Sequence, residues 1–184
     1  MNISAMNPDS DSAPLFQISI ESHVIKTPDF VYSVVSDLPS CHQWSEECAG
    51  GEWIHGDPGA VGSVFRGHNF RRADVVAWAP VVRGSWTTTA EVVAAEPDHR
   101  FSWAMRTDAG RAQDSVWGFT LRPAEGGTAL THHFCMGVAT EGIQGITAEM
   151  SDDEKKRFFK EWGAKVKTDM AATVGRLKKV IEAS

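Results

Sequence analysis

The C-terminal part of the chain carries one long apolar stripe that limits what the rest of the chain can form. Ser151 with Glu154 three residues later predicts a capping box at the start of a helix. Apolar side chains then recur every three or four residues: Phe158, Trp162, Val166, Met170, Val174, Leu177 and Ile181. This spacing predicts one amphipathic helix of about eight turns. Because such a helix needs a wide apolar surface to lie across, we expect a sheet elsewhere in the chain.

Strand-like segments precede this helix. The segment 15–25 alternates Phe16, Ile18 and Ile20 with polar residues, which is the period of a half-buried strand. Turn-forming residues separate the further strand-like segments 48–54, 61–70, 85–95, 100–107, 114–123 and 128–136. Loops of this length predict an antiparallel meander. A short helix beginning at Pro28 is expected after the first strand, followed after Pro39 by a second short helix or a turn.

This order of elements resembles the helix-grip fold of the START/birch-allergen (SRPBCC) superfamily, and more closely its polyketide cyclase/dehydrase branch. The phrases that carry the resemblance are "ISIESHVIKTPDFVYSVVSDLPSCHQW", "GSVFRGHN", "EVVAAEPDHRFSW" and "GGTALTHHF", within residues 15–182. The resemblance implies an α+β fold in which a curved antiparallel sheet of about seven strands surrounds the long C-terminal helix and encloses a hydrophobic cavity. We expect a disordered leader at residues 1–14 and a single START-like ligand-binding domain at residues 15–184.

Charge and cysteine content exclude several classes of function. A formal net charge of −6 argues against a nucleic-acid partner, because binding a phosphate backbone needs a basic face. Three cysteines without framework spacing fit free thiols in a reducing cytoplasm. No apolar run approaches the length of a membrane span, so no stable membrane insertion is expected.

Motifs for cofactor or metal chemistry are also missing from the sequence. It has no phosphate-binding loop, no dinucleotide-binding glycine fingerprint and no GxSxG nucleophile motif. Cys41, His42, Cys48 and His55 match no zinc-binding spacing. Glu46 and Glu47 are adjacent acids at the end of an expected element, where helix capping and solvation account for their presence. We therefore expect neither a cofactor nor a metal ion.

If the sheet encloses a cavity, alternation sorts its side chains into an inner and an outer face. His132 then faces inward, because it shares the apolar face of the last strand with Leu130, Phe134 and Met136. An imidazole in such a place needs a partner, since an unsatisfied buried polar group costs roughly 1–3 kcal/mol.

The stretch "VGSVFRGHNFRR" offers three polar partners within a strand that otherwise reads as core. Alternation places Arg66 and His68 on one face of this strand and Asn69 with Phe65 on the other. The sequence leaves open which face looks inward. The resemblance implies cofactor-free cyclisation, in which Arg66 or Asn69 polarises a carbonyl and His132 or His68 carries a proton with a pKa near neutral.

Seven tryptophans against a single tyrosine predict an aromatic-lined cavity, which suits a planar aromatic or polyketide-like ligand. The residues expected to contact this ligand are Trp44, Trp53, Phe65, Trp86, Trp103, Met105, Trp117, Phe119, Phe134, Phe158, Trp162 and Val166.

Three functions remain open at this point. The first is a cyclase or dehydratase, the second a non-catalytic carrier of a hydrophobic small molecule or lipid, and the third an interaction protein with a shallow cavity. A monomer or a homodimer fits each of them. Segment 71–84 is expected either to extend a hairpin or to form a flap over the cavity, and segment 137–150 to form a gate.

Overall fold

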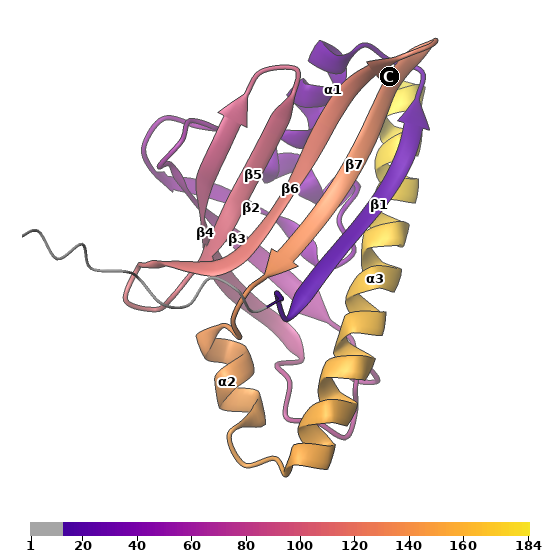
Figure 1. Ribbon diagram of the computed structural model, residues 1–184. Coiled ribbons are helices and arrows are strands. Elements are labelled where there is room, and N and C mark those ends of the chain that lie inside the picture. The colour runs from indigo at the N-terminus through magenta and orange to yellow at the C-terminus, as the bar shows by residue number, and fades with distance from the viewer. Residues whose placement is uncertain (1–12) are drawn as a thin grey trace, which may run out of the picture.

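Seven antiparallel strands form one curved sheet, and a long helix lies along it (Figure 1). This computed structural model describes residues 13–184. Residues 1–12 of the leader expected at residues 1–14 therefore lie outside the described residues. In chain order the elements are β1 (Phe16–Val24), α1 (Pro28–Val35), the 3-10 helix η1 (Leu38–Gln43), β2 (Cys48–His55), β3 (Val64–Arg71), β4 (Gly84–Glu96), β5 (Arg100–Arg106), β6 (Ala112–Ala124), β7 (Gly127–Met136), α2 (Glu141–Thr147) and α3 (Asp152–Ala183).

The strands follow one another as a meander from β2 to β7, and β1 returns to pair with β7. The sheet order is therefore β1-β7-β6-β5-β4-β3-β2, with every neighbouring pair antiparallel. In Figure 1 the sheet bends around the side on which α1 and α3 lie. The predicted α+β helix-grip fold is confirmed.

Helix α3 buries its apolar stripe as its spacing predicts. All seven residues of the stripe are buried. The helix packs along β1 and reaches η1, so it spans the length of the sheet (Figure 1). None of the helices within residues 13–184 combines the length and the apolar character that a membrane span requires.

Two apolar clusters lie one after the other along α3. Leu177 and Ile181, in the C-terminal half of α3, pack with α1, η1 and the inner residues of β5 and β6. Phe158 and Trp162, in its N-terminal half, pack with β1, β7, α2 and the segment between β3 and β4. The two halves of α3 therefore pack into different clusters, and members of both clusters surround a hollow.

Segment 72–83, between β3 and β4, forms no strand, so the alternative that it extends the hairpin is wrong. Its apolar residues, among them Trp78 and Val81, belong to the cluster around Phe158. Arg83 holds the segment by donating hydrogen bonds to the backbone carbonyl oxygens of Val75, Val76, Ala79 and Val81. Trp78 donates from Nε1 to Glu161 of α3 at 2.6 Å. The segment thus closes one end of the molecule as a packed part of the core.

The capping box of α3 gives a first test. Ser151 Oγ accepts from the Glu154 amide at 3.4 Å, and the Glu154 carboxylate accepts from the Ser151 amide at 2.8 Å. Ser151→Ala removes one of these bonds and leaves a helix amide without its partner. We expect it to lower the free energy of unfolding by about 1 kcal/mol, measured by urea denaturation. Lys160→Ala, at an exposed position of the same helix, is the matched control, and equal losses in both variants would contradict this role of the cap.

Candidate functional site

A cavity of about 420 Å³ lies between the inner face of the sheet and α3. Its walls come from η1, from strands β2 to β7, from α2 and from the middle of α3. Members of both apolar clusters line it, so it occupies the hollow between them. This volume lies within the range of small-molecule sites, roughly 300–1,000 Å³.

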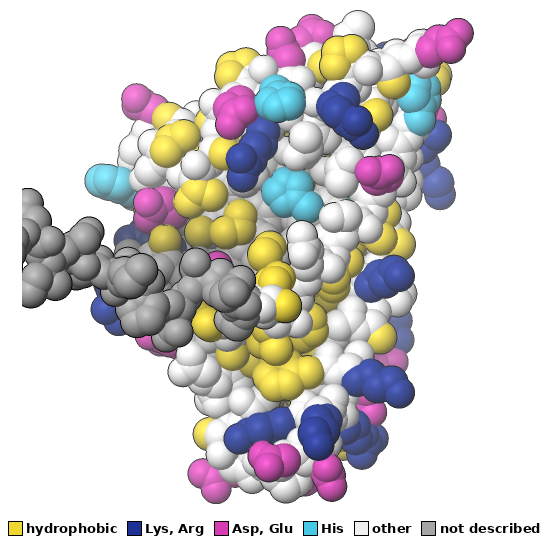
Figure 2. Space-filling model, viewed as in Figure 1, with side chains coloured by type: hydrophobic (Ala, Val, Ile, Leu, Met, Phe, Trp, Pro, Cys, Tyr) yellow, Lys and Arg dark blue, Asp and Glu magenta, His cyan; other side chains and the backbone are white. Residues whose placement is uncertain are grey.

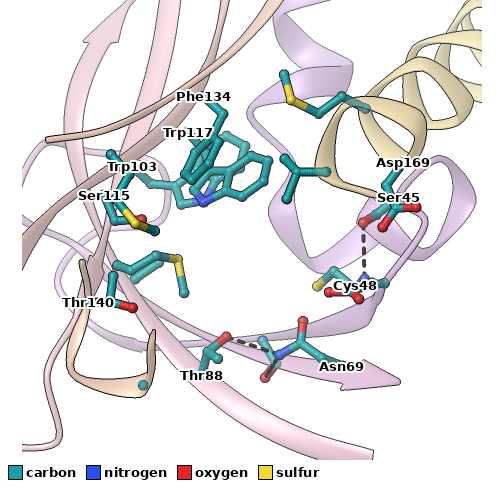
Figure 3. A pocket seen from close by; sticks show the side chains of 18 of the residues that line it. Ser45, Cys48, Asn69, Thr88, Trp103, Ser115, Trp117, Phe134, Thr140 and Asp169 are labelled. Atoms are coloured by element: carbon teal, nitrogen blue, oxygen red, sulfur yellow. Dashed lines mark hydrogen bonds between the residues drawn. The ribbon is translucent and has the colours of Figure 1, made fainter. Parts of the chain in front are cut away.

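One wall is an aromatic surface built by strand register. Trp103 on β5 lies opposite Trp117 on β6, and Trp117 lies opposite Phe134 on β7. The rings of Trp117 and Phe134 stack with centroids 4.0 Å apart. Figure 3 shows the three side chains together on one side of the cavity. The antiparallel pairing therefore brings three rings from three strands into one apolar wall.

Strand β3 faces the cavity through its odd-numbered residues. Phe65, Gly67, Asn69 and Arg71 line the cavity. Asn69 donates from Nδ2 to Thr88 Oγ1 at 3.0 Å, and both lie across the space from the aromatic wall (Figure 3). Asn69 therefore lies on the face of β3 that looks into the cavity. Its catalytic role stays a prediction.

Arg66 and His68 lie on the outer face of the sheet, which corrects their assignment to the cavity. Arg66 Nη1 lies 3.3 Å and His68 Nε2 2.8 Å from the carboxylate of Glu52 on β2. About half of each of these side chains is exposed, at 47% and 52%. Because inward-facing Phe65 and Asn69 determine the parity of β3, neither residue reaches a ligand in the cavity.

An ionic network that the sequence did not reveal borders the cavity. Arg71 forms a two-pronged ion pair with Glu47, at 2.7 Å from Nε and 3.0 Å from Nη2. Lys165 also binds Glu47 and lies 2.7 Å from Asp169 Oδ2. Burial acts to raise the pKa of Glu47, but the hydrogen bonds from Arg71 and the charge of Lys165 outweigh it and hold this pKa below its ordinary value. Glu47 is thus a partly buried member of the cavity wall, which corrects its interpretation as a solvated end residue.

Two indole rings hold Arg71 in place. Its guanidinium lies 4.4 Å from the ring centroid of Trp86 and 4.9 Å from that of Trp162. Its remaining prong, Nη1, donates to the Val82 carbonyl oxygen at 2.8 Å. The one sequence signal for this network is the pair Lys165 and Asp169, which lies four residues apart beside the apolar stripe of α3.

His132 faces inward as predicted, but it is not poised to titrate near neutral pH. Its Nδ1 donates to the Gly118 carbonyl oxygen at 2.9 Å, and its ring stacks on Phe119 with centroids 4.3 Å apart. Burial lowers the pKa of His132 to about 4. The ring is therefore neutral at physiological pH, with Nε2 as its acceptor nitrogen, and the expectation of a near-neutral proton carrier is wrong.

Trp44 brings an unpaired donor to the cavity wall. Its side chain is 4% exposed and lines the cavity. Within residues 13–184, its buried Nε1 finds no hydrogen-bond acceptor. An unpaired buried donor costs roughly 1–3 kcal/mol. Because Nε1 itself is buried, a ligand in the cavity does not reach this donor unless the ring shifts.

The predicted ligand-contacting residues divide into two groups. Those that line the cavity are Trp44, Phe65, Trp86, Trp103, Met105, Trp117, Phe134, Trp162 and Val166. Trp53, Phe119 and Phe158 lie outside the lining, because their rings pack against other core rings. Trp53 packs on Phe65, Phe119 stacks behind His132, and Phe158 packs with Trp78 and Trp162.

The gate expected at 137–150 contains helix α2, and Thr140, Gly142, Ile143 and Ile146 of this segment line the cavity. Thr140 Oγ1 caps the helix by accepting from the Ile143 amide. No group of three or more His, Cys, Asp or Glu side chains within residues 13–184 is arranged to hold a metal ion.

Comparisons with known proteins agree with this geometry. The family model described as polyketide cyclase / dehydrase and lipid transport matches residues 16–182. Comparison with curated protein sequences found no match.

Among solved structures, the Polyketide_cyc-like protein Cgl2372 from Corynebacterium glutamicum is 22% identical with a TM-score of 0.61, covering 92% of this chain and 93% of that chain. A protein of unknown function from Staphylococcus aureus, SA2116, has a TM-score of 0.64 at 15% identity, with coverage of 91% and 94%. The Aha1 dimer from Colwellia psychrerythraea has a TM-score of 0.54 at 15% identity, with coverage of 91% and 96%. At these identities the likeness shows the fold alone.

The buried state of His132 predicts a pH dependence of stability. Its pKa is about 4 in the folded chain against an ordinary value of 6.5. As the pH falls from 6.5 to 4, the unfolded chain takes up a proton that the folded chain does not, so stability is lost over this window. The loss expected from this residue is about 3 kcal/mol. It is measured as the difference in free energy of unfolding between the wild type and His132→Gln in urea titrations from pH 7 to pH 4. A difference in free energy of unfolding that stays constant over this range would contradict the burial of a neutral ring. His42→Gln, at an exposed position, is the control.

Proposed function

The chain belongs to the polyketide cyclase/dehydrase and lipid transport family of the SRPBCC superfamily, and from this premise we propose that it binds a hydrophobic small molecule with a planar aromatic body in the cavity. We further propose that it acts as a carrier, holding this ligand without changing it. The observation that carries the proposal is the aromatic wall of Trp103, Trp117 and Phe134, which faces the apolar stripe of α3 across about 420 Å³.

The polar groups of the cavity support a ligand with no net charge. The charges of the ionic network are two cations, Arg71 and Lys165, and two anions, Glu47 and Asp169, and they pair with one another. An anionic ligand would have to compete for cations that already have carboxylate partners. A neutral ligand leaves these pairs intact.

The distribution of polar side chains favours binding over catalysis. Acid–base catalysis needs donors and acceptors that converge on one reacting atom. Arg66 and His68 lie on the outer face, and burial holds His132 neutral against the Gly118 carbonyl. Asn69 lies next to Thr88 across the cavity from the aromatic wall. Of the four groups expected to act together, only Asn69 and His132 line the cavity, which favours a binding protein over a complete acid–base site.

Cyclisation with loss of water is the second candidate function. Two observations favour it: the family description includes cyclases and dehydrases, and both Asn69 and His132 line the cavity. In this mechanism Asn69 donates to a carbonyl oxygen and His132 accepts a proton at Nε2. The third alternative, an interaction protein, predicts a shallow cavity, and a space of about 420 Å³ bordered by both core clusters argues against it. A cytoplasmic location and a monomeric or dimeric state stay predictions.

Removing one ring of the aromatic wall tests the binding proposal. Trp117→Ala deletes the middle ring, and we expect it to weaken binding of a hydroxyanthraquinone probe at least about tenfold, measured by isothermal titration calorimetry. Trp53→Ala is the matched control, because it deletes an indole of the same sheet that lies outside the cavity lining. The proposal fails if both variants bind like the wild type or lose affinity equally.

A turnover assay separates the carrier from the cyclase. The protein is incubated with a linear poly-β-ketone thioester and the products are followed by mass spectrometry. For a carrier we expect the compound to be recovered at the rate of loss seen in buffer alone. A product lighter by one water, formed by the wild type and no longer formed by Asn69→Leu, would replace the carrier proposal with the cyclase.

A further inference from the structure

Two of the three cysteines meet in the wall of the cavity. Cys41 lies on η1 and Cys48 begins β2, and their Sγ atoms are 2.9 Å apart with Cys41 as the donor. Both line the cavity. Figure 3 shows Cys48 beside Ser45 and Asp169, facing the space where a ligand would lie. Both thiols are free.

Local structure holds the two sulfur atoms together. Cys41 is anchored through its carbonyl oxygen, which accepts from the amides of Trp44 and Ser45 at 3.0 and 2.7 Å. Cys48 is anchored through its amide, which donates to Ser45 Oγ at 3.0 Å. Gly50, with a φ of +100°, allows β2 to approach η1, because a Cβ atom there would lie 2.9 Å from the Pro39 carbonyl oxygen. The thiol pair is thus built into the fold, and little movement is needed to join its sulfur atoms.

We infer that Cys41 and Cys48 form a thiol-oxidation site, which closes into a reversible disulfide in the cavity wall when a hydroperoxide enters. The Cys48 thiolate attacks the peroxide oxygen, the O–O bond breaks, and the departing hydroxide or alkoxide takes a proton and leaves as water or an alcohol. Cys48 is then a sulfenic acid. The Cys41 sulfur attacks it, the S–S bond forms, and the S–O bond breaks with release of water. The two thiols lose two electrons and the peroxide gains them.

The environment of the pair favours Cys48 as the attacking sulfur. The hydrogen bond from the Cys41 thiol lowers the pKa of Cys48, and the same bond raises the pKa of Cys41. Cys48 is also the more exposed of the two, since Cys41 is 2% exposed. Once Cys48 is a neutral sulfenic acid, the negative charge that opposed ionisation of Cys41 is gone, which assists the second step.

The oxidation goes beyond the proposed function and does not depend on it. Only the effect of oxidation on ligand binding rests on the proposed function. Cys48 pairs with Asn69 in the β2–β3 register, so a disulfide at Cys48 alters the wall beside one of the polar groups of the cavity. Cys135 gives an internal comparison, because it lies on β7 outside the cavity lining.

The test uses the full chain, reduced and then treated with an equimolar amount of hydrogen peroxide. We expect the intact mass to fall by two hydrogens, peptide mapping to link Cys41 with Cys48, and dithiothreitol to reverse both changes. Cys135→Ser should behave identically. In Cys41→Ser the second step is blocked, so a sulfenic acid should be trapped at Cys48 by dimedone, and Cys48→Ser should show neither product.

Measurements on the wild type alone keep the inference falsifiable if a variant does not fold. The disulfide closes a short loop, so we expect the oxidised protein to melt about 5 °C above the reduced one. Oxidation that falls first on Cys135, or that leaves Cys48 as a sulfinic acid without a crosslink, would overturn the inference. None of these measurements uses the ligand, so a failure here is distinct from a failure of the hydroxyanthraquinone titration. The same titration on the oxidised protein measures the effect of the disulfide on affinity.

Discussion

The burial of one helical stripe against a curved sheet is the constraint on which the rest of this molecule depends. The stripe of α3 is long enough to need the whole length of the sheet, and its two halves pack into two apolar clusters. Val166 and Met170 pack in the second cluster with residues of β1 and β7, and they also line the cavity that the curved sheet leaves on its inner side. The same packing that stabilises the fold therefore leaves room for a ligand.

Charges that border such a space must be paired within the protein, because an isolated charge in an apolar wall is expensive. Arg71 shows how this is done here. Two indole faces, a carboxylate and a backbone carbonyl together satisfy its guanidinium. Charges on the outer surface need no such pairing, because water screens them. Figure 2 shows acidic and basic side chains interspersed over one face of the molecule. Arg66 and His68 belong to this outer population, although they are sequence neighbours of two cavity residues.

The thiol pair adds chemical reactivity to a wall made mostly of apolar side chains and paired charges. Cys41 and Cys48 lie beside Ser45 and Asn69, so a change in their oxidation state alters the cavity next to its polar groups. A binding site of this kind couples what the cavity holds to the redox conditions around it.

The local sequence by itself determined the long helix, its capping box and the strands, because these depend on residues that are neighbours in the sequence. Alternation also placed His132 on the apolar face of its strand, and its inward direction followed from the cavity that the family resemblance implied. The same periodicity assigned Arg66 and Asn69 to opposite faces of one strand but did not say which face looks inward. Only pairing with β2 and β4, and the curvature of the sheet, decided this in favour of Asn69. The ion pairs of Glu47 with Arg71 and Lys165 join residues 24 and 118 positions apart. Contacts over such separations leave no periodic signal in the sequence, and the pKa of His132 likewise depends on burial that only the packed structure provides.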